Sequence, residues 1–327
     1  MKRAWASRGF TLVELLIVIV IIGILAAITI ISYNGVSSRA RVAAVQADLK
    51  QDAQALEAYK VTNSAYPTSM SSAGIPASTN STVGYFPSGT GGYCLQEVNG
   101  STSYAITSTN QVPMQGDCTT AGLIGWWKLN GDTIDTSSNN LSGTVVGTAT
   151  YGTGANGYKS LSFDGTSNYV RLPTFTADFS SGVTVSAWMN PSVVTSQSRL
   201  VDLGGGVANN IIVYRQQTTQ NLVFELWIGA GKACVATAPS IIVNGSWHLY
   251  TVTEDTLDKV TFFVDGSPMA NGQCTTEPSS ATRTSSYIGK SNWPGDPLYQ
   301  GSMQDVRLYN RGLSASEVLS LYSGGAQ

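Results

Sequence analysis

Residues 8–14 read Arg8-Gly9-Phe10-Thr11-Leu12-Val13-Glu14 and open an apolar run that continues to residue 31. A short basic leader precedes the small-residue joint at Gly9. The run is long enough to span a bilayer, because about 20 apolar residues suffice. Glu14 is the one acid within the run, and an ionisable group in lipid costs on the order of 2–3 kcal/mol. A partner that neutralises Glu14 is therefore the simplest explanation of its position.

This arrangement resembles the class III signal of type IV pilins and pseudopilins. The resemblance implies that a prepilin peptidase cuts after Gly9 and removes residues 1–9 as a leader peptide. It also implies that Phe10 becomes an N-methylated first residue and that Glu14 pairs with the free amino group of a neighbouring subunit. The expected partners are the peptidase, other pilin subunits and the pilus assembly machinery.

Two other interpretations compete for this segment. An ordinary secretory signal has an apolar core of about 7–15 residues that ends at a small-x-small cleavage site. Here the run is longer, contains Glu14 and meets only a weak match at Ala27-Ile28-Thr29. A plain membrane anchor fits the length of the run but not the acid. We favour the pilin-type interpretation because the joint, the acid and the continuing helix agree.

Composition and charge indicate an exported, β-rich protein. The 327 residues leave room for two folded regions and a targeting segment, and charged residues are only 12%. Three of the 18 Lys and Arg residues lie in the leader, which leaves 15 against 20 acidic residues. A mildly acidic chain without a basic run argues against direct nucleic-acid binding.

Lys2 and Arg3 precede the apolar run, and positive charge before a span favours a cytoplasmic N-terminus. We therefore expect membrane contact through residues 10–31, with the rest of the chain outside. The expected location is the cell membrane before assembly and then an extracellular pilus or pseudopilus.

The four cysteines, Cys94, Cys118, Cys234 and Cys274, show no C-x-x-C spacing of a zinc or thioredoxin-like site. Their even number and the exported context suggest disulfides. The sequence permits three connectivities. We favour Cys94–Cys118 and Cys234–Cys274, because each pair then falls within one proposed folded region.

The segments after the joint predict a long helix and a small sheet. Apolar residues at spacings of three and four extend to about residue 60, so residues 10–60 are expected to form one helix. Asn63 and Pro67 are expected to end it. Residues 61–121 are rich in Ser, Thr and Gly with short apolar patches, and we interpret them as a small antiparallel sheet packed on the outer half of the helix. A linker is the alternative for part of this region.

A second unit over residues 122–327 reads as short strands separated by turn residues. In residues 222–228 apolar side chains alternate, with Glu225 and Trp227 on the opposite face. Asp265-Gly266 is a hairpin turn signal. A helical period of useful length appears only at residues 314–321. These features predict a two-sheet sandwich.

Several blocks of this unit resemble a concanavalin A-like, laminin G-type jelly roll, in the family's order. The expected fold class is therefore α+β: a long pilin helix with a small β region, followed by an all-β jelly-roll sandwich. The blocks are GWWKL at 125–129, LSFDG at 161–165, VTVSAWM at 183–189, WHLYTVT at 247–253, VDG at 264–266 and GSMQDVRLYNR at 301–311.

The sequence offers little support for catalysis. Enzymes of this jelly-roll class place catalytic acids as E-x-D-x-x-E on one strand, since glycoside cleavage needs two carboxylates a fixed distance apart. The motif is absent, and Glu254, Asp255 and Asp258 have the wrong spacing. The sole histidine, His248, is interpreted as a structural strand residue. We therefore expect that the protein is not an enzyme and has no catalytic residues.

A structural calcium ion is a possible cofactor, because many laminin G-like jelly rolls hold a hard cation with oxygen ligands at the sandwich edge. Asp305, in the closing strand, is the first candidate ligand. Asn130, Asp132 and Asp135 lie in the opening loop, which comes close to that strand in this fold class. The alternative is that these four are ordinary turn and strand residues.

Aromatic side chains outside the core are the candidates for sugar or protein binding. Trp227 shares a strand face with Glu225, and Trp293 and Tyr299 lie in a loop with two prolines and a glycine. These three could stack on a sugar ring or simply cap the sandwich edge. The favoured function is a pilin-like subunit that displays the jelly roll for adhesion to a glycan or surface protein. The alternatives are a pseudopilin of a type II secretion or DNA-uptake system, which uses the jelly roll for docking, and a membrane-anchored lectin-like protein.

Overall fold

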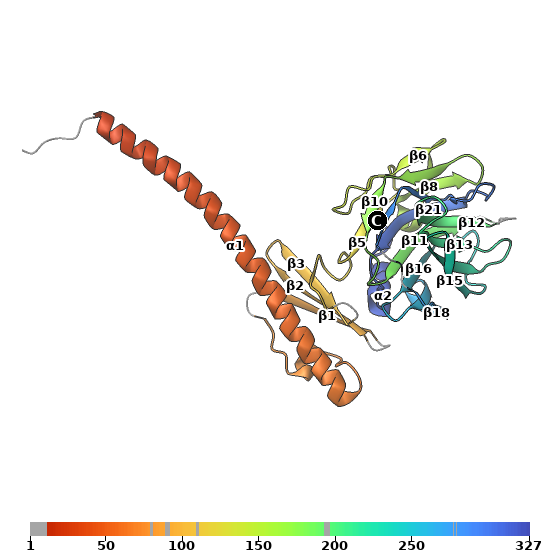
Figure 1. Cartoon of the computed structure of the whole chain (residues 1–327), viewed down its shortest axis with the longest axis horizontal. Coiled ribbons are helices and arrows are strands. Elements are labelled where there is room, and N and C mark those ends of the chain that lie inside the picture. Colours follow the sequence, from red (N-terminus) through yellow and green to blue (C-terminus); the bar gives the residue numbers. More distant parts are fainter. Residues whose placement is uncertain are drawn as a thin grey trace, which may run out of the picture.

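A single long helix, α1 (Leu12–Asn63), forms the N-terminal part of the computed structural model. The structure describes residues 12–78, 81–88, 92–108, 111–192, 197–276, 278 and 280–327. The 52 residues of α1 correspond to roughly 78 Å at 1.5 Å per residue. Its first half projects away from the rest of the protein (Figure 1). Among the described residues, no helix is long and apolar enough to cross a membrane.

The second half of α1 packs on a four-stranded antiparallel sheet, as predicted for residues 61–121. Four apolar residues at spacings of three and four, Val45, Leu49, Ala53 and Leu56, are buried against Tyr93, Leu95 and Ile106 of that sheet. The helix ends where Ser64 takes a positive φ of 60°. A short 3₁₀ helix, η1 (Met70–Ala73), follows. The sheet has the order β1 (Thr82–Ser88), β2 (Gly92–Asn99), β3 (Thr102–Thr107) and β4 (Met114–Gln115).

The contact between α1 and the small sheet contains a carboxyl group with a raised pKa. Burial, followed by the nearby charges of Glu97 and Asp48, raises the pKa of Asp52 from 3.8 to about 6. The folded state therefore holds this proton more tightly than the unfolded state does. The resulting stabilisation is fully present below about pH 4 and is lost as the pH rises through about 6. We expect Asp52→Asn to flatten the decline of the unfolding midpoint over this pH interval, measured by circular dichroism, whereas the exposed Asp178→Asn should leave it intact.

The C-terminal unit is a sandwich of two large antiparallel sheets, which confirms the predicted jelly roll. The eight-stranded sheet has the order β18 (Ser267–Gln273), β17 (Lys259–Val264), β16 (His248–Glu254), β11 (Val183–Pro191), β21 (Gln300–Tyr309), β8 (Lys159–Asp164) and β7 (Thr150–Thr153), with β5 (Leu123–Trp127) also paired to β21. The seven-stranded sheet has the order β15 (Gly231–Ala238), β14 (Leu222–Ile228), β13 (Ile211–Arg215), β12 (Ser198–Gly204), β20 (Ser285–Ile288), β9 (Tyr169–Leu172) and β6 (Thr144–Val146).

Smaller elements complete the unit: a strand pair of β10 (Phe175–Ala177) and β19 (Ala281–Arg283), the 3₁₀ helix η2 (Ala155–Gly157), and the helix α2 (Ala315–Ser323). Asp265 and Gly266 join β17 to β18 with φ values of 52° and 77°, the conformation of a tight hairpin turn. Ser314 caps α2 in a capping box with Glu317.

Both predicted disulfides are present. Cys94–Cys118 ties β2 of the small sheet to the turn before the sandwich. Cys234–Cys274 joins β15, the edge of the seven-stranded sheet, to the residue after β18, the edge of the eight-stranded sheet. The second bridge therefore holds adjacent edges of the two sheets together.

The small sheet and the sandwich meet through a buried arginine. The Arg311 guanidinium, with 0% of its side chain exposed, donates from Nε to the Ala121 carbonyl at 2.7 Å and from Nη2 to the Cys118 carbonyl at 3.0 Å. Its Nη1 lies 2.8 Å from Oε1 of Glu317, on α2. One side chain thus connects the segment after β21, α2 and the turn that carries the Cys94–Cys118 bridge.

Further contacts fix this junction. The Tyr309 hydroxyl donates to the Thr119 carbonyl at 2.7 Å, and α2 lies beside β1 (Figure 1). Gly122 links the two units with φ of 76°, and a Cβ there would stand 2.8 Å from Oδ1 of Asn310. Only glycine combines this conformation with so close an approach. The sandwich is therefore held against the small sheet and is not tethered by a free linker.

Candidate functional site

Two tryptophans meet on the solvent-facing side of the seven-stranded sheet. Along β14, Leu222, Phe224 and Leu226 enter the sandwich core, so Trp227 faces outward, as the alternation predicts. Trp293 belongs to the loop between β20 and β21. The two ring centroids lie 5.0 Å apart with an interplanar angle of 47°. Both rings are half-buried and pack over buried outward-facing residues of β13 and β14, namely Ile212, Tyr214 and Val223.

Charged neighbours fix the orientation of Trp227. Its Nε1 donates to Oε1 of Glu225 at 2.9 Å. The same carboxylate oxygen lies 2.6 Å from Nζ of Lys232, whose ammonium group is 5.5 Å from the Trp227 ring centroid. A buried carboxylate therefore holds the indole, and a half-exposed cation stands beside it. Such a ring is a suitable surface for stacking on a ligand.

A network of hydrogen bonds holds the loop that carries Trp293. Asp202, fully buried in β12, accepts from the backbone and side-chain amides of Asn292 at 2.8 Å and 2.9 Å, and from Asn210 at 2.6 Å. Burial raises the pKa of Asp202, while these donors oppose that effect. Asp296, in the same loop, pairs with Arg199 at 2.8 Å. The aromatic patch formed by Trp227 and Trp293 is therefore pre-organised on its Trp293 side.

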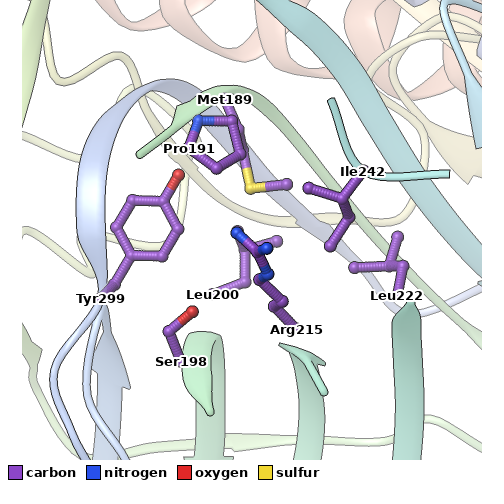
Figure 2. Close-up of a pocket in the computed structure, with 8 residues that line it drawn as sticks. All are labelled: Met189, Pro191, Ser198, Leu200, Arg215, Leu222, Ile242 and Tyr299. Atoms are coloured by element: carbon purple, nitrogen blue, oxygen red, sulfur yellow. The ribbon is translucent and has the colours of Figure 1, made fainter. Parts of the chain in front are cut away.

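Tyr299, predicted as a third member of this patch, lies elsewhere. Its side chain is only 3% exposed and packs edge-to-face on Phe163 with centroids 5.6 Å apart. The backbone nitrogen of Tyr299 donates to the Gly289 carbonyl at 2.9 Å, which closes the loop and turns the ring inward. The prediction that Tyr299 stacks on a surface ligand is wrong, because the ring lines an interior cavity (Figure 2).

The carboxylate of Asp305 does not fit a calcium site. Asp305 pairs with Arg307 through two bonds of 2.8 Å and 2.9 Å, and its Oδ1 also accepts from Nε1 of Trp126. Arg307 shares the face of Asp305 because residues two apart in a strand point to the same side. The guanidinium neutralises the charge that a cation would need.

Of the opening-loop candidates, Asp135 has both carboxylate oxygens occupied by the loop itself. Asp135 accepts from the backbone nitrogens of Trp126, Ser137 and Leu141 and from the Ser137 hydroxyl. Asp132 accepts from the Ile134 nitrogen, and Asn130 lies half-buried in the same loop. These are the bonds of turn formers.

Among the described residues, the one cluster of three potential metal ligands is Cys94, Cys118 and Glu317, and its cysteines form a disulfide. The structural calcium ion stays a prediction, and the four proposed ligands do not support it.

His248 and Asp255, two of the residues considered for catalysis, take structural positions. Nδ1 of His248 lies 2.7 Å from Oδ2 of Asp265, whose Oδ1 accepts from the Leu249 nitrogen. This pair stabilises the hairpin between β17 and β18. Asp255 accepts from the backbone nitrogens of Leu257 and Lys259 and so shapes the turn between β16 and β17. The absence of enzymatic activity stays a prediction.

Gly9 and Phe10 lie outside the described residues, and of Glu14 only the helical backbone is described. Two features were missed in the sequence: the Arg311 junction, and a cavity lined by Arg215 and Tyr299. Each brings together residues that are far apart in the chain, so no local sequence pattern predicts it.

The two ends of the chain match two family models. Residues 6–30 match a model described as the prokaryotic N-terminal methylation motif. Residues 164–319 match the concanavalin A-like lectin/glucanases superfamily.

Relatives of the N-terminal part are pilins and pseudopilins. The type II secretion system core protein G of Pseudomonas aeruginosa is 43% identical over 68 residues, which are 21% of this chain and 47% of that protein. The fimbrial protein of Neisseria meningitidis serogroup A is 36% identical over 74 residues, 23% of this chain and 44% of that protein. The chain thus spans about half the length of these curated relatives.

The sandwich is similar to solved jelly rolls. Domain 4 of the extracellular arabinanase AbnA from Geobacillus stearothermophilus superposes with a TM-score of 0.50 and 20% identity, over 63% of this chain and 98% of that one. A botulinum neurotoxin serotype D/C binding domain gives a TM-score of 0.50 and 12% identity, over 62% of this chain and 52% of that one. These likenesses concern the fold. The chain combines a pilin-type N-terminal methylation motif with a concanavalin A-like, laminin G-type domain.

Proposed function

We propose that this protein is a subunit of a type IV pilus-like filament that displays its jelly roll for adhesion. The observation that carries the proposal is the continuity of the molecule. An apolar helix projects at one end, and a lectin-like sandwich is held against the pilin-like sheet at the other (Figure 1). The contacts that Arg311 makes with Cys118, Ala121 and Glu317 would then set the position of the sandwich relative to the filament.

The first half of α1 supplies the assembly surface. The apolar side chains described there are exposed, for example Leu12 at 79% and Leu25 at 57%. Such a surface requires lipid or another protein around it. In the proposed sequence of events, residues 10–31 lie in the cell membrane until a prepilin peptidase cuts after Gly9. The helix then leaves lipid for the filament core, where Glu14 meets the Phe10 amino group of a neighbouring subunit, and the sandwich is displayed outside the cell.

The charge of Glu14 gives a direct test of this assembly step. We expect Glu14→Ala to leave membrane insertion intact, because it removes an acid from an apolar run, and to reduce incorporation into filaments by at least about tenfold. Immunoblots of sheared filaments and of membranes measure both quantities. The neighbouring Thr11→Ala serves as a control that should assemble normally. Normal incorporation of Glu14→Ala would remove the charge-pairing argument.

For recognition, we propose that the Trp227–Trp293 pair contacts a glycan or a surface protein. Glu225 fixes one ring, and the Asp202 network fixes the loop of the other. Pre-organised aromatic side chains lose little entropy on binding, which favours affinity. Adjacent Lys232 and Asp296 offer polar partners to hydroxyl or amide groups.

Removal of one indole should measure this role. If Trp227 is a binding hot spot, Trp227→Ala should weaken the binding of purified protein to a glycan array or to host cells by about 30-fold, equivalent to about 2 kcal/mol. Trp227→Phe should retain part of the affinity. The control is Tyr158→Ala, which replaces an exposed aromatic residue directly after η2. This variant should bind like the unmodified protein. Equal binding by all three variants would refute a role for the patch.

A second candidate function is that of a pseudopilin in a secretion or DNA-uptake machine, with the sandwich as a docking module. The similarity to the type II secretion system core protein G of Pseudomonas aeruginosa favours it. Deletion of the gene separates the two. Loss of secreted proteins with unchanged cell adhesion supports the pseudopilin, and loss of adhesion with normal secretion supports the adhesive pilus.

A further inference from the structure

One end of the sandwich contains a small cavity between the two sheets. Its volume of about 10 Å³ leaves room for one small species, such as a water molecule or a monatomic ion. Figure 2 shows Arg215 between Tyr299 and Ser198 on one side and Leu222 and Ile242 on the other. The apolar lining consists of Met189, Pro191, Leu200, Leu222 and Ile242.

Arg215 carries a positive charge into this interior, and no carboxylate of the described residues pairs with it. Only 6% of the residue is exposed. Its Nε donates to the Thr219 carbonyl at 2.7 Å, and its Nη1 donates to the Ser192 carbonyl at 3.2 Å and to Oδ1 of Asn244 at 2.8 Å. All three acceptors are neutral. Burial lowers the pKa of Arg215, as expected where the surroundings leave the charge uncompensated.

Other buried arginines of the described chain show what is usual here. Arg199, Arg307 and Arg311 each have a carboxylate within 2.8 Å. Arg283 pairs with no carboxylate among the described residues but lies 4.6 Å from the Phe179 ring centroid, where a cation–π interaction offsets part of its charge. Arg215 instead faces a cavity, and this cavity offers a binding position for a negatively charged ligand.

A second polar group is left without a partner at the same cavity. The hydroxyl of Tyr299 is buried and makes no hydrogen bond to any described residue. Burial raises the pKa of Tyr299 far above its usual range, so the hydroxyl keeps its proton and is available as a donor. An unmade hydrogen bond of a buried polar group costs about 1–3 kcal/mol. Two donors, one of them charged, therefore face a cavity whose lining, among the described residues, contains no carboxylate.

We propose that this cavity binds a monovalent anion of about the size of chloride, held by the Arg215 guanidinium and the Tyr299 hydroxyl. The volume excludes a sugar ring or a peptide, and buried charges are generally paired. A halide also tolerates the apolar walls better than a strongly hydrated oxyanion does. Because Arg215 bonds to Ser192, Thr219 and Asn244, a bound anion would stabilise the loops at this end of the sandwich.

Thermal unfolding of the full chain in a non-ionic detergent tests the proposal. The midpoint is measured by tryptophan fluorescence in equal concentrations of sodium chloride and sodium gluconate. We expect chloride to raise the midpoint by about 2–4 °C, since a ligand that binds only the folded state stabilises it. Arg215→Gln should abolish the difference between the two salts. Arg283→Gln is the matched control, because it removes the other buried arginine without a carboxylate and should retain the difference.

Should Arg215→Gln fail to fold, Tyr299→Phe keeps the test open, because it removes one donor and should shift the chloride response to higher concentration. Crystals grown with sodium bromide give an independent readout. An anomalous bromide peak within hydrogen-bonding distance of Arg215 and Tyr299 supports the proposal. Water alone at that position in bromide-grown crystals, or equal midpoints in chloride and gluconate, overturns it.

Discussion

Replacement of Arg311 by methionine is expected to lower the free energy of unfolding by about 3–5 kcal/mol, because removal of one partner leaves the other charge buried and unpaired. The guanidinium is fully buried and pairs with Glu317, whose side chain is 2% exposed. The same change deprives the carbonyls of Cys118 and Ala121 of their donor. We therefore also expect the small sheet and the sandwich to unfold as two separate transitions, which denaturant titration followed by circular dichroism would show.

A second substitution distinguishes loss of the ion pair from loss of packing. Arg311→Met combined with Glu317→Gln removes the stranded charge, while glutamine still suits the capping box with Ser314. The double variant should recover part of the lost stability. Arg171→Ala, at an exposed position, should change the free energy by no more than about 0.5 kcal/mol. An Arg311→Met protein as stable as the unmodified chain would contradict the role of this junction.

Removal of the Cys234–Cys274 disulfide should produce the other large effect. The bridge closes a loop with a sequence separation of 40 residues. In the chain-entropy account, a closed loop of this size stabilises the folded state by about 4 kcal/mol. We expect Cys234→Ala combined with Cys274→Ala to lower the unfolding midpoint of the sandwich by about 8–16 °C, measured by calorimetry.

The other disulfide is the matched comparison. Cys94→Ala combined with Cys118→Ala opens a shorter loop, with a separation of 24 residues, and lies in the small sheet. It should lower the free energy of unfolding by about 3.5 kcal/mol while the edges of the sandwich remain joined. A larger loss of stability in this variant than in the Cys234 and Cys274 double variant would contradict the chain-entropy account.

Features with a local period could be predicted from the sequence. The spacing of Val45, Leu49, Ala53 and Leu56 predicted the helix face that packs on the small sheet. Alternation in β14 placed Trp227 outside, and Asp265-Gly266 marked the hairpin turn. In each case the residues that decide the structure lie within one or two turns or strands of each other, so their pattern is visible in the chain.

Features that depend on distant contacts could not be predicted. The bonds of Arg311 reach residues 190 and 193 positions earlier in the chain. In the sequence, Asp305 is a carboxylate that could bind a metal ion. Only the structure shows that Arg307 and Trp126 donate hydrogen bonds to this carboxylate. Tyr299 follows a loop rich in surface residues, yet its ring turns into the core because the loop closes on Gly289.

In the proposed function, one buried junction joins an assembly helix to a recognition module, and the protein polymerises through a processed N-terminus. Filaments sheared from cells should therefore contain this chain, and mass spectrometry of its N-terminal peptide should find an N-methylated Phe10 as the first residue. A chain that still begins at Met1 and is confined to the membrane fraction would contradict the claim and leave an anchored, lectin-like protein.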